Sequence, residues 1–166
     1  TSMINTAVGA NAGKSVTTGT FNTFVGGLAG DATDDGQSNT AVGYLALSAN
    51  CGNGNTSIGK QNLTVCTGAE NTSLGVGAGY QVTSGDNNVL IGYESGRTGS
   101  PGGAITTADN TLCLGDERIT ASHVQVDWTV ASDQRDKTDF TALDLGLDFV
   151  KALAPVTYKW DKRSKY

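Results

Sequence analysis

The pattern of apolar and polar positions in the first two thirds of the chain is one short segment, Asn-Thr-x-aliphatic-Gly, that returns seven times. Its final glycines lie 17, 17, 16, 16, 17 and 23 residues apart. They are Gly9, Gly26, Gly43, Gly59, Gly75, Gly92 and Gly115, and the last two copies are weaker than the others. A period of 16–17 residues is too long for one strand and too short for a helical hairpin. It therefore predicts a parallel β-solenoid or β-roll whose coils each hold two short strands and two turns.

Each position of the repeat carries its own expectation. We expect the aliphatic residue before each glycine to face a narrow core, and the Thr and Ser beside it to face outward. The small residue three positions after the glycine lets coils stack closely, and the recurring Asn predicts a ladder of hydrogen bonds between coils. A further glycine precedes the Asn by three residues in five copies, at Gly19, Gly36, Gly52, Gly68 and Gly85. These glycines predict turns or close backbone approach.

Such a coil has a small core of its own. One aliphatic residue and one alanine per coil bury an area that, at about 25 cal/mol per Å², barely offsets the entropy of ordering the coil. A second apolar surface would stabilise the stack, and an identical chain is the simplest source of one. The pattern therefore predicts a homo-oligomer, because a monomeric solenoid would need end caps that the sequence does not display.

Composition and charge narrow the function classes. Glycine supplies 23 of 166 residues, while aromatic residues reach 7% and charged residues 16%, which argues against an ordinary enzyme with a large aromatic core. The net charge of −5 divides into −6 for residues 1–131 and +1 for residues 132–166, which places a boundary near Ser132. An acidic first part disfavours nucleic acid as a partner, and no apolar run is long enough to insert into a membrane. The start at Thr1 reads as a cut piece, so nothing follows from the lack of a signal peptide.

The pattern changes after Gly115. Residues 119–131 alternate loosely and predict one or two connecting strands, and residues 141–153 have the apolar spacing of a short amphipathic helix. Pro155 ends that helix, and residues 156–160 alternate again as a strand. We therefore expect a small α+β fragment at 132–166, behind a solenoid at 1–118.

Both parts resemble known families. The repeat over residues 3–115 resembles the β-roll heads of trimeric autotransporter adhesins and, more closely, the repeat shafts of phage tail fibres, which implies a homotrimer. In the second part, Ser132-Asp-x-Arg-x-Lys137 is followed by a helix and then by Leu153-x-Pro-Val-x-Tyr-x-Trp160. That order resembles the start of the endosialidase-type intramolecular chaperone domain of phage tail spikes and fibres. The later segments of that domain are absent here, so residues 132–166 would be its incomplete N-terminal part.

In that family the domain assists trimer folding and then cuts itself off through a Ser–Lys pair. The resemblance implies Ser132 as the nucleophile, Lys137 as its base and Asp133 as an auxiliary residue, with cleavage at Ala131–Ser132 or Ser132–Asp133. Burial would have to lower the pKa of the lysine for it to act as a base. Without the resemblance, Ser132 and Asp133 would read as a turn or helix cap, and Lys137 as a solvated side chain.

Weaker signals indicate neither a cofactor nor a metal. Residues 9–15 mimic a phosphate loop, but Val8 stands where its first glycine is required. Asp31, Asp34 and Asp35 are read as a solvated turn rather than a cation site. The cysteines Cys51, Cys66 and Cys113 are expected to be buried free thiols, although Cys51 and Cys66 occupy nearly equivalent places in neighbouring repeats and could approach each other. The lone His123 is read as a surface or packing residue.

The sequence therefore predicts a structural segment of a phage tail fibre or virion appendage. Its one possible chemistry is a single self-cleavage, and no multiple-turnover enzyme activity is expected. It would be assembled in the host cytoplasm and located on the virion. The alternative is a receptor-binding adhesin head, of phage or bacterial surface, in which exposed Thr, Asn and Tyr side chains bind a host glycan. The tyrosines concerned are Tyr44, Tyr80 and Tyr93.

Overall fold

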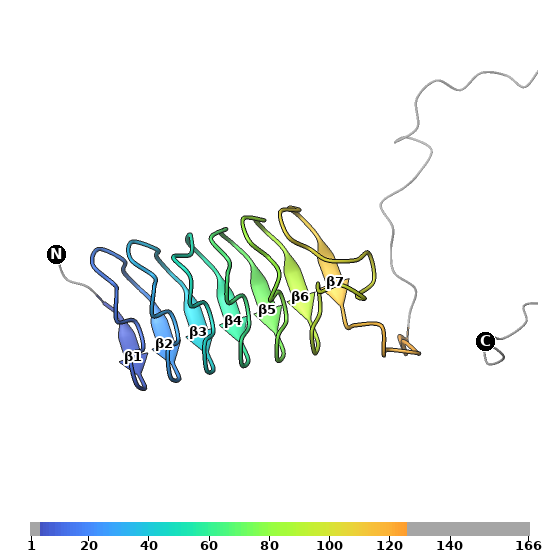
Figure 1. The fold of residues 1–166 in the computed structure, drawn as a ribbon, viewed down its shortest axis with the longest axis horizontal. Coiled ribbons are helices and arrows are strands. Elements are labelled where there is room, and N and C mark those ends of the chain that lie inside the picture. The colour runs from blue at the N-terminus through green and yellow to red at the C-terminus, as the bar shows by residue number, and fades with distance from the viewer. Residues whose placement is uncertain (1–3, 126–166) are drawn as a thin grey trace, which may run out of the picture. The chain divides into compact units, whose positions relative to one another are not determined.

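A computed structural model describes residues 4–125, and these form an all-parallel β-solenoid with no helix among them. Each coil contributes one three-residue strand, and the strands pair in chain order into a seven-stranded sheet (Figure 1). They are β1 (Thr6–Val8), β2 (Thr23–Val25), β3 (Thr40–Val42), β4 (Thr56–Ile58), β5 (Thr72–Leu74), β6 (Val89–Ile91) and β7 (Leu112–Leu114). The predicted solenoid is confirmed. The expectation of two strands per coil is wrong, because turns and bends form the rest of each described coil.

The predicted second part falls largely beyond the described residues. Residues 119–125 run without a strand, and the remainder of the predicted connecting segment at 119–131 lies outside the described part. The α+β fragment expected at 132–166 also lies outside it.

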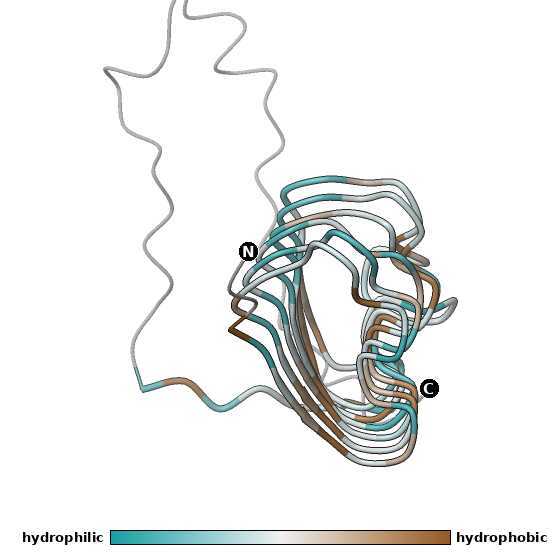
Figure 2. Ribbon diagram, turned by 90° about the vertical axis from the view of Figure 1, so that its left-hand side faces the viewer, coloured by the Kyte–Doolittle hydropathy of each residue, from teal (hydrophilic) through white to brown (hydrophobic). Residues whose placement is uncertain are grey.

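Equivalent residues of successive coils lie over one another. Thr6 opposes Thr23 and Val8 opposes Val25, and the same register continues through all six strand pairs. Rows of like residues therefore run along the stack, and Figure 2 shows apolar positions recurring at the same place in successive coils. The register is kept although the coils have 16, 17 or 23 residues, because the turns between the strands take up the difference in length.

The central residue of each strand, rather than the aliphatic residue before the glycine, faces the interior. These central residues are Phe24, Ala41, Ser57, Ser73, Leu90 and Cys113, all buried, whereas Ala7 in the terminal strand β1 is exposed. The expectation that the aliphatic residue points inward is therefore wrong. Alternation along a strand places Thr and the aliphatic residue on one face and the central residue on the other, but it does not say which face is inside.

Two of the inward-facing residues are serines, and their hydroxyl groups are satisfied within the core. Ser57 donates a hydrogen bond of 3.0 Å to the carbonyl oxygen of Asn62, and Ser73 donates to the Asn62 side-chain oxygen. Asn62 stands where most other coils have the small residue after the glycine, and its amide donates to the carbonyl of Gly75 at 2.7 Å. Asn62, at a position where most coils have Ala, lets the two serines be buried, because it accepts the hydrogen bonds that their hydroxyl groups need in the core.

Side chains on opposite sides of the coil fill the interior in a complementary way. Where the strand contributes Phe24, the position four residues after the repeat glycine is Gly30, and a Cβ there would lie 2.5 Å from the Phe24 ring. Where the strand contributes Ala41, the same position is Leu47, which is fully buried. This position has a left-handed backbone in both coils, with φ of 58° at Gly30 and 50° at Leu47. In these two coils the residue at this position complements the volume that the strand supplies.

The repeat asparagines form the predicted ladder. The backbone N–H of Asn55 donates to Asn39 Oδ1 at 2.8 Å, and the N–H of Asn71 donates to Asn55 Oδ1 at 3.0 Å. Each Asn amide also donates to a carbonyl in the neighbouring coil, as from Asn55 to Gly68 at 2.9 Å. The acceptors are mostly the glycines three residues before the next Asn. Their lack of a side chain lets the coils approach this closely, since a Cβ at Gly36 would lie 2.6 Å from the Cys51 carbonyl oxygen.

Replacing Asn55 with alanine is expected to lower the free energy of unfolding by about 2–3 kcal/mol, because the Asn71 N–H would be left buried without a partner and the Gly68 carbonyl would lose its shortest hydrogen bond. Chemical denaturation followed by circular dichroism measures this loss. Asn53→Ala is the matched control: the Asn53 side chain also accepts from a neighbouring coil, from the Gln37 N–H at 2.8 Å, but in an exposed place where water substitutes. Equal losses in the two variants would contradict the role given to the buried ladder.

Candidate functional site

The catalytic residues predicted from the sequence lie outside the described residues. This applies to Ser132, Asp133 and Lys137, and to both predicted scissile bonds. The described part of the chain is the solenoid that precedes them, and its surface holds the remaining candidate contact residues.

The outer face of the sheet carries two parallel rows of side chains. One is the aliphatic row, formed by Val8, Val25, Val42, Ile58, Leu74, Ile91 and Leu114. The other is the threonine row, formed by Thr6, Thr23, Thr40, Thr56 and Thr72 and continued by Val89 and Leu112. The aliphatic row stays accessible along its length, since Val8 is 58% exposed, Leu74 48% and Leu114 44%. Contiguous apolar surface of this kind marks a contact site.

Neither row holds a charged side chain, although residues 1–131 carry a net charge of −6. The acidic side chains of the solenoid, such as Asp34, Asp35 and Glu70, belong to the turns between the strands. The face can therefore make apolar and hydroxyl contacts but cannot attract a partner by charge. The repeat pattern alone does not reveal this surface, since the aliphatic residue before each glycine is expected from it to lie in the core. The bulky residues at the centres of β2 and β6, Phe24 and Leu90, are the signal that could have revealed it.

The tyrosines proposed for glycan binding have different surroundings. Tyr44 is 49% exposed, whereas the Arg97 guanidinium lies 5.1 Å from the centre of the Tyr80 ring and that of Arg118 lies 4.2 Å from the centre of the Tyr93 ring. An arginine thus occupies one face of each of the latter two rings in a cation–π contact. Tyr44 is the one of the three without such a contact in the described part of the chain.

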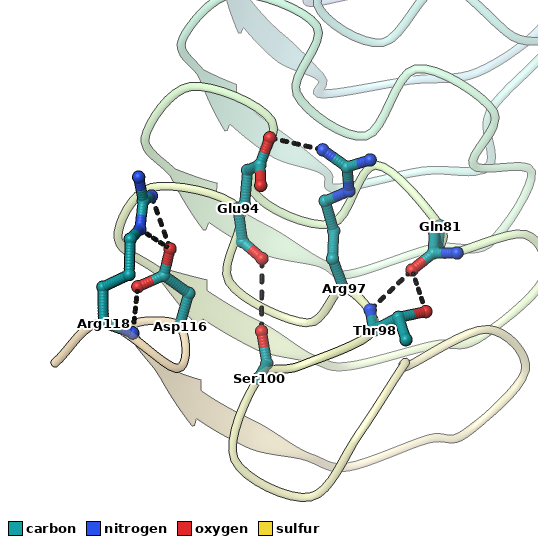
Figure 3. A network of polar contacts seen from close by, with 7 residues as sticks. All are labelled: Gln81, Glu94, Arg97, Thr98, Ser100, Asp116 and Arg118. Carbon is teal, nitrogen blue, oxygen red and sulfur yellow. Dashed lines mark hydrogen bonds and ion pairs between the residues drawn. The ribbon is translucent and has the colours of Figure 1, made fainter.

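A cluster of polar contacts surrounds these arginines at the last coil (Figure 3). Arg97 pairs with Glu94 and Arg118 pairs with Asp116, each with a nitrogen–oxygen distance of 2.5 Å. The hydrogen bonds from Arg118 hold the pKa of Asp116 below its ordinary value. The longer, 23-residue coil between β6 and β7 is joined to the preceding coil by Arg97 on the Tyr80 ring and by the hydrogen bond from the Thr98 N–H to Gln81 at 2.8 Å, and we assign the cluster a structural role.

The cysteines and the acidic residues singled out in the sequence form no catalytic or metal-binding cluster in the described residues. Cys51, Cys66 and Cys113 are free and buried, as expected. Burial raises the pKa of Cys66 to about 11 and that of Cys51 above its ordinary value, which keeps both thiols neutral and poorly nucleophilic. Asp34 accepts a hydrogen bond from Thr17. Among residues 4–125 no three His, Cys, Asp or Glu side chains gather as a metal site, and no helix could cross a membrane.

Comparison with known proteins identifies the C-terminal segment. Residues 132–165 match the model of the family Peptidase_S74, described as chaperone of endosialidase. Neither the curated proteins nor the solved structures contain a match to this chain. The chain thus joins a β-solenoid to an endosialidase-type chaperone domain at its C-terminus, and the resemblance drawn from Ser132-Asp-x-Arg-x-Lys137 and Leu153-x-Pro-Val is confirmed.

Proposed function

We propose that this protein is a structural segment of a trimeric fibre, a phage tail fibre or other virion appendage, in which the solenoid forms the shaft. The solenoid would occupy residues 1–118, a connection residues 119–131, and the beginning of the chaperone domain residues 132–166. The observation that carries the proposal is the order of the two parts: a stack of parallel coils comes first and the endosialidase chaperone match comes after it in the same chain. Domains of that type are typical of trimeric fibres.

The chaperone segment would help three copies assemble and then separate from the shaft by self-cleavage. Lys137, made neutral by burial in the trimer, would accept the proton of the Ser132 hydroxyl as its oxygen attacks the Ala131 carbonyl. The Ala131–Ser132 amide bond breaks as the ester forms, and the proton passes to the freed Ser132 amine. Water then hydrolyses the ester, giving a carboxylate at Ala131 and a new N-terminus at Ser132. Attack on the Ser132–Asp133 bond is the second possibility.

Mass spectrometry of the full-length gene product tests the cleavage. We expect a C-terminal fragment that begins at Ser132 or Asp133, and we expect Ser132→Ala and Lys137→Ala to reduce its yield at least a hundredfold, since each removes one partner of the pair. Lys151→Ala is the control and should cut normally. An uncut wild-type protein that is trimeric by light scattering would contradict the self-cleavage, while leaving the fibre role intact.

A receptor-binding head is the second candidate function, and the exposed ring of Tyr44 favours it. An exposed aromatic ring is a surface on which a sugar can stack. A glycan array probed with the assembled protein and with Tyr44→Ala would test this role. Binding that is lost in the variant would support a head, on a phage or on a bacterial surface, and the absence of any binding would favour the shaft.

A further inference from the structure

We propose that the aliphatic row, together with the threonine row beside it, is the surface through which three copies of this chain pack side by side, parallel and in register. This inference rests on the proposed function, which supplies the trimer, and it adds the residues that hold the trimer together. In the proposed trimer, the central residues of the strands form the core of each single chain. The residues before the repeat glycines form the core between the chains.

The length and repeat of the surface indicate its occupant. The aliphatic row runs unbroken through all seven strands, which at about 4.8 Å per coil makes it about 29 Å long. A partner that covers such a row needs an apolar position at the same interval along the same length. A second copy of this chain has that surface by construction, so each side chain of one copy meets its equivalent in the next.

Charge points to the same occupant. Copies of an acidic solenoid repel one another, and the repulsion is smallest when they approach through a face that holds no charge. The outer face of the strands is such a face, whereas the turns carry Asp34, Asp35, Glu70 and Asp86. A basic partner would be attracted to those turns instead of the sheet.

The number of copies comes from the proposed fibre, and the surface is narrow enough for three of them to meet at one axis. Three residues of strand give a width of about 10 Å, so the face has a footprint of roughly 300 Å². When three such faces surround a common axis parallel to the stack, each copy contacts two others, and the aliphatic row is shielded from water on both sides.

Light scattering on the 166-residue chain tests the surface. Leu74 lies in the middle of the aliphatic row, and Leu74→Glu is expected to reduce the molar mass threefold, from trimer to monomer, with an unchanged circular dichroism spectrum. Val65→Glu is the matched control, because Val65 is similarly exposed, at 42%, but lies in the turns between β4 and β5. It should remain trimeric.

A cross-linking variant keeps the inference testable should Leu74→Glu fail to fold. Leu74→Cys places one thiol per copy near the common axis, so oxidation should give a covalent dimer on a non-reducing gel, whereas Val65→Cys should stay monomeric there. The native cysteines are buried and contribute little background. A trimeric wild type that does not cross-link through Leu74→Cys overturns this surface but not the proposed fibre. A monomeric wild type overturns both.

Discussion

Replacing Gly75 with alanine is expected to destabilise the solenoid by more than about 4 kcal/mol, although the change adds only one methyl group. Gly75 ends its repeat with φ of 132°, a conformation that residues with a side chain rarely adopt. An added Cβ would lie 2.5 Å from the carbonyl oxygen and 2.7 Å from the carbonyl carbon of Gly92, the equivalent glycine of the next coil. Because both atoms are backbone, no rotamer change relieves the overlap, and the coils must separate.

The strain of the backbone angle and the overlap with the next coil can be measured apart. Gly102 also has a positive φ, of 83°, but a Cβ there meets nothing within 4 Å. Gly102→Ala should therefore cost only about 1 kcal/mol, from the angle alone. Denaturant unfolding of both variants, followed by circular dichroism, makes the comparison. A Gly75→Ala protein as stable as Gly102→Ala would show that the coils can move apart without cost.

The sequence was sufficient to predict the solenoid, its register and its asparagine ladder, because these depend on spacing. Gly9 to Gly115 recur at near-constant intervals, and like positions in a solenoid must stack. Which side of each strand is buried depends on volume, and the repeat segment alone does not contain that information. It emerges when two neighbouring coils are compared, since Phe24 lies opposite Gly30 in one and Ala41 lies opposite Leu47 in the next.

The candidate site was predictable to a different degree. The Ser132-Asp-x-Arg-x-Lys137 segment was recognisable because its chemistry is concentrated in six consecutive residues, and the family match covers it. The exposed aliphatic row was not recognised, because an aliphatic residue in a strand is usually expected in the core, and in this solenoid it lies on the outer face. Ile58 and Leu74 stand beside buried Ser57 and Ser73, where the usual ranking of inside and outside is reversed.

Phe24→Ala is expected to lower the free energy of unfolding by about 3–5 kcal/mol, because it empties the interior of the second coil. The Phe24 ring is fully buried and lies against Gly30 of its own coil and Gly13 of the preceding one, and neither glycine has a side chain that could move into the space. Phe21→Ala is the matched control, since that ring is 61% exposed and its loss should change stability by no more than about 0.5 kcal/mol.

A second substitution, across the coil from Phe24, should restore part of the stability lost in Phe24→Ala. The next coil fills the same space with Ala41 and Leu47, and Leu47 has nearly the backbone angle of Gly30. The double variant Phe24→Ala, Gly30→Leu reproduces that pair, so we expect it to recover about half of the stability lost in Phe24→Ala, because the new side chain refills most of the cavity. Gly30→Leu alone should destabilise, since the Phe24 ring already occupies the space. A double variant less stable than Phe24→Ala would contradict the volume exchange between the two sides of the coil.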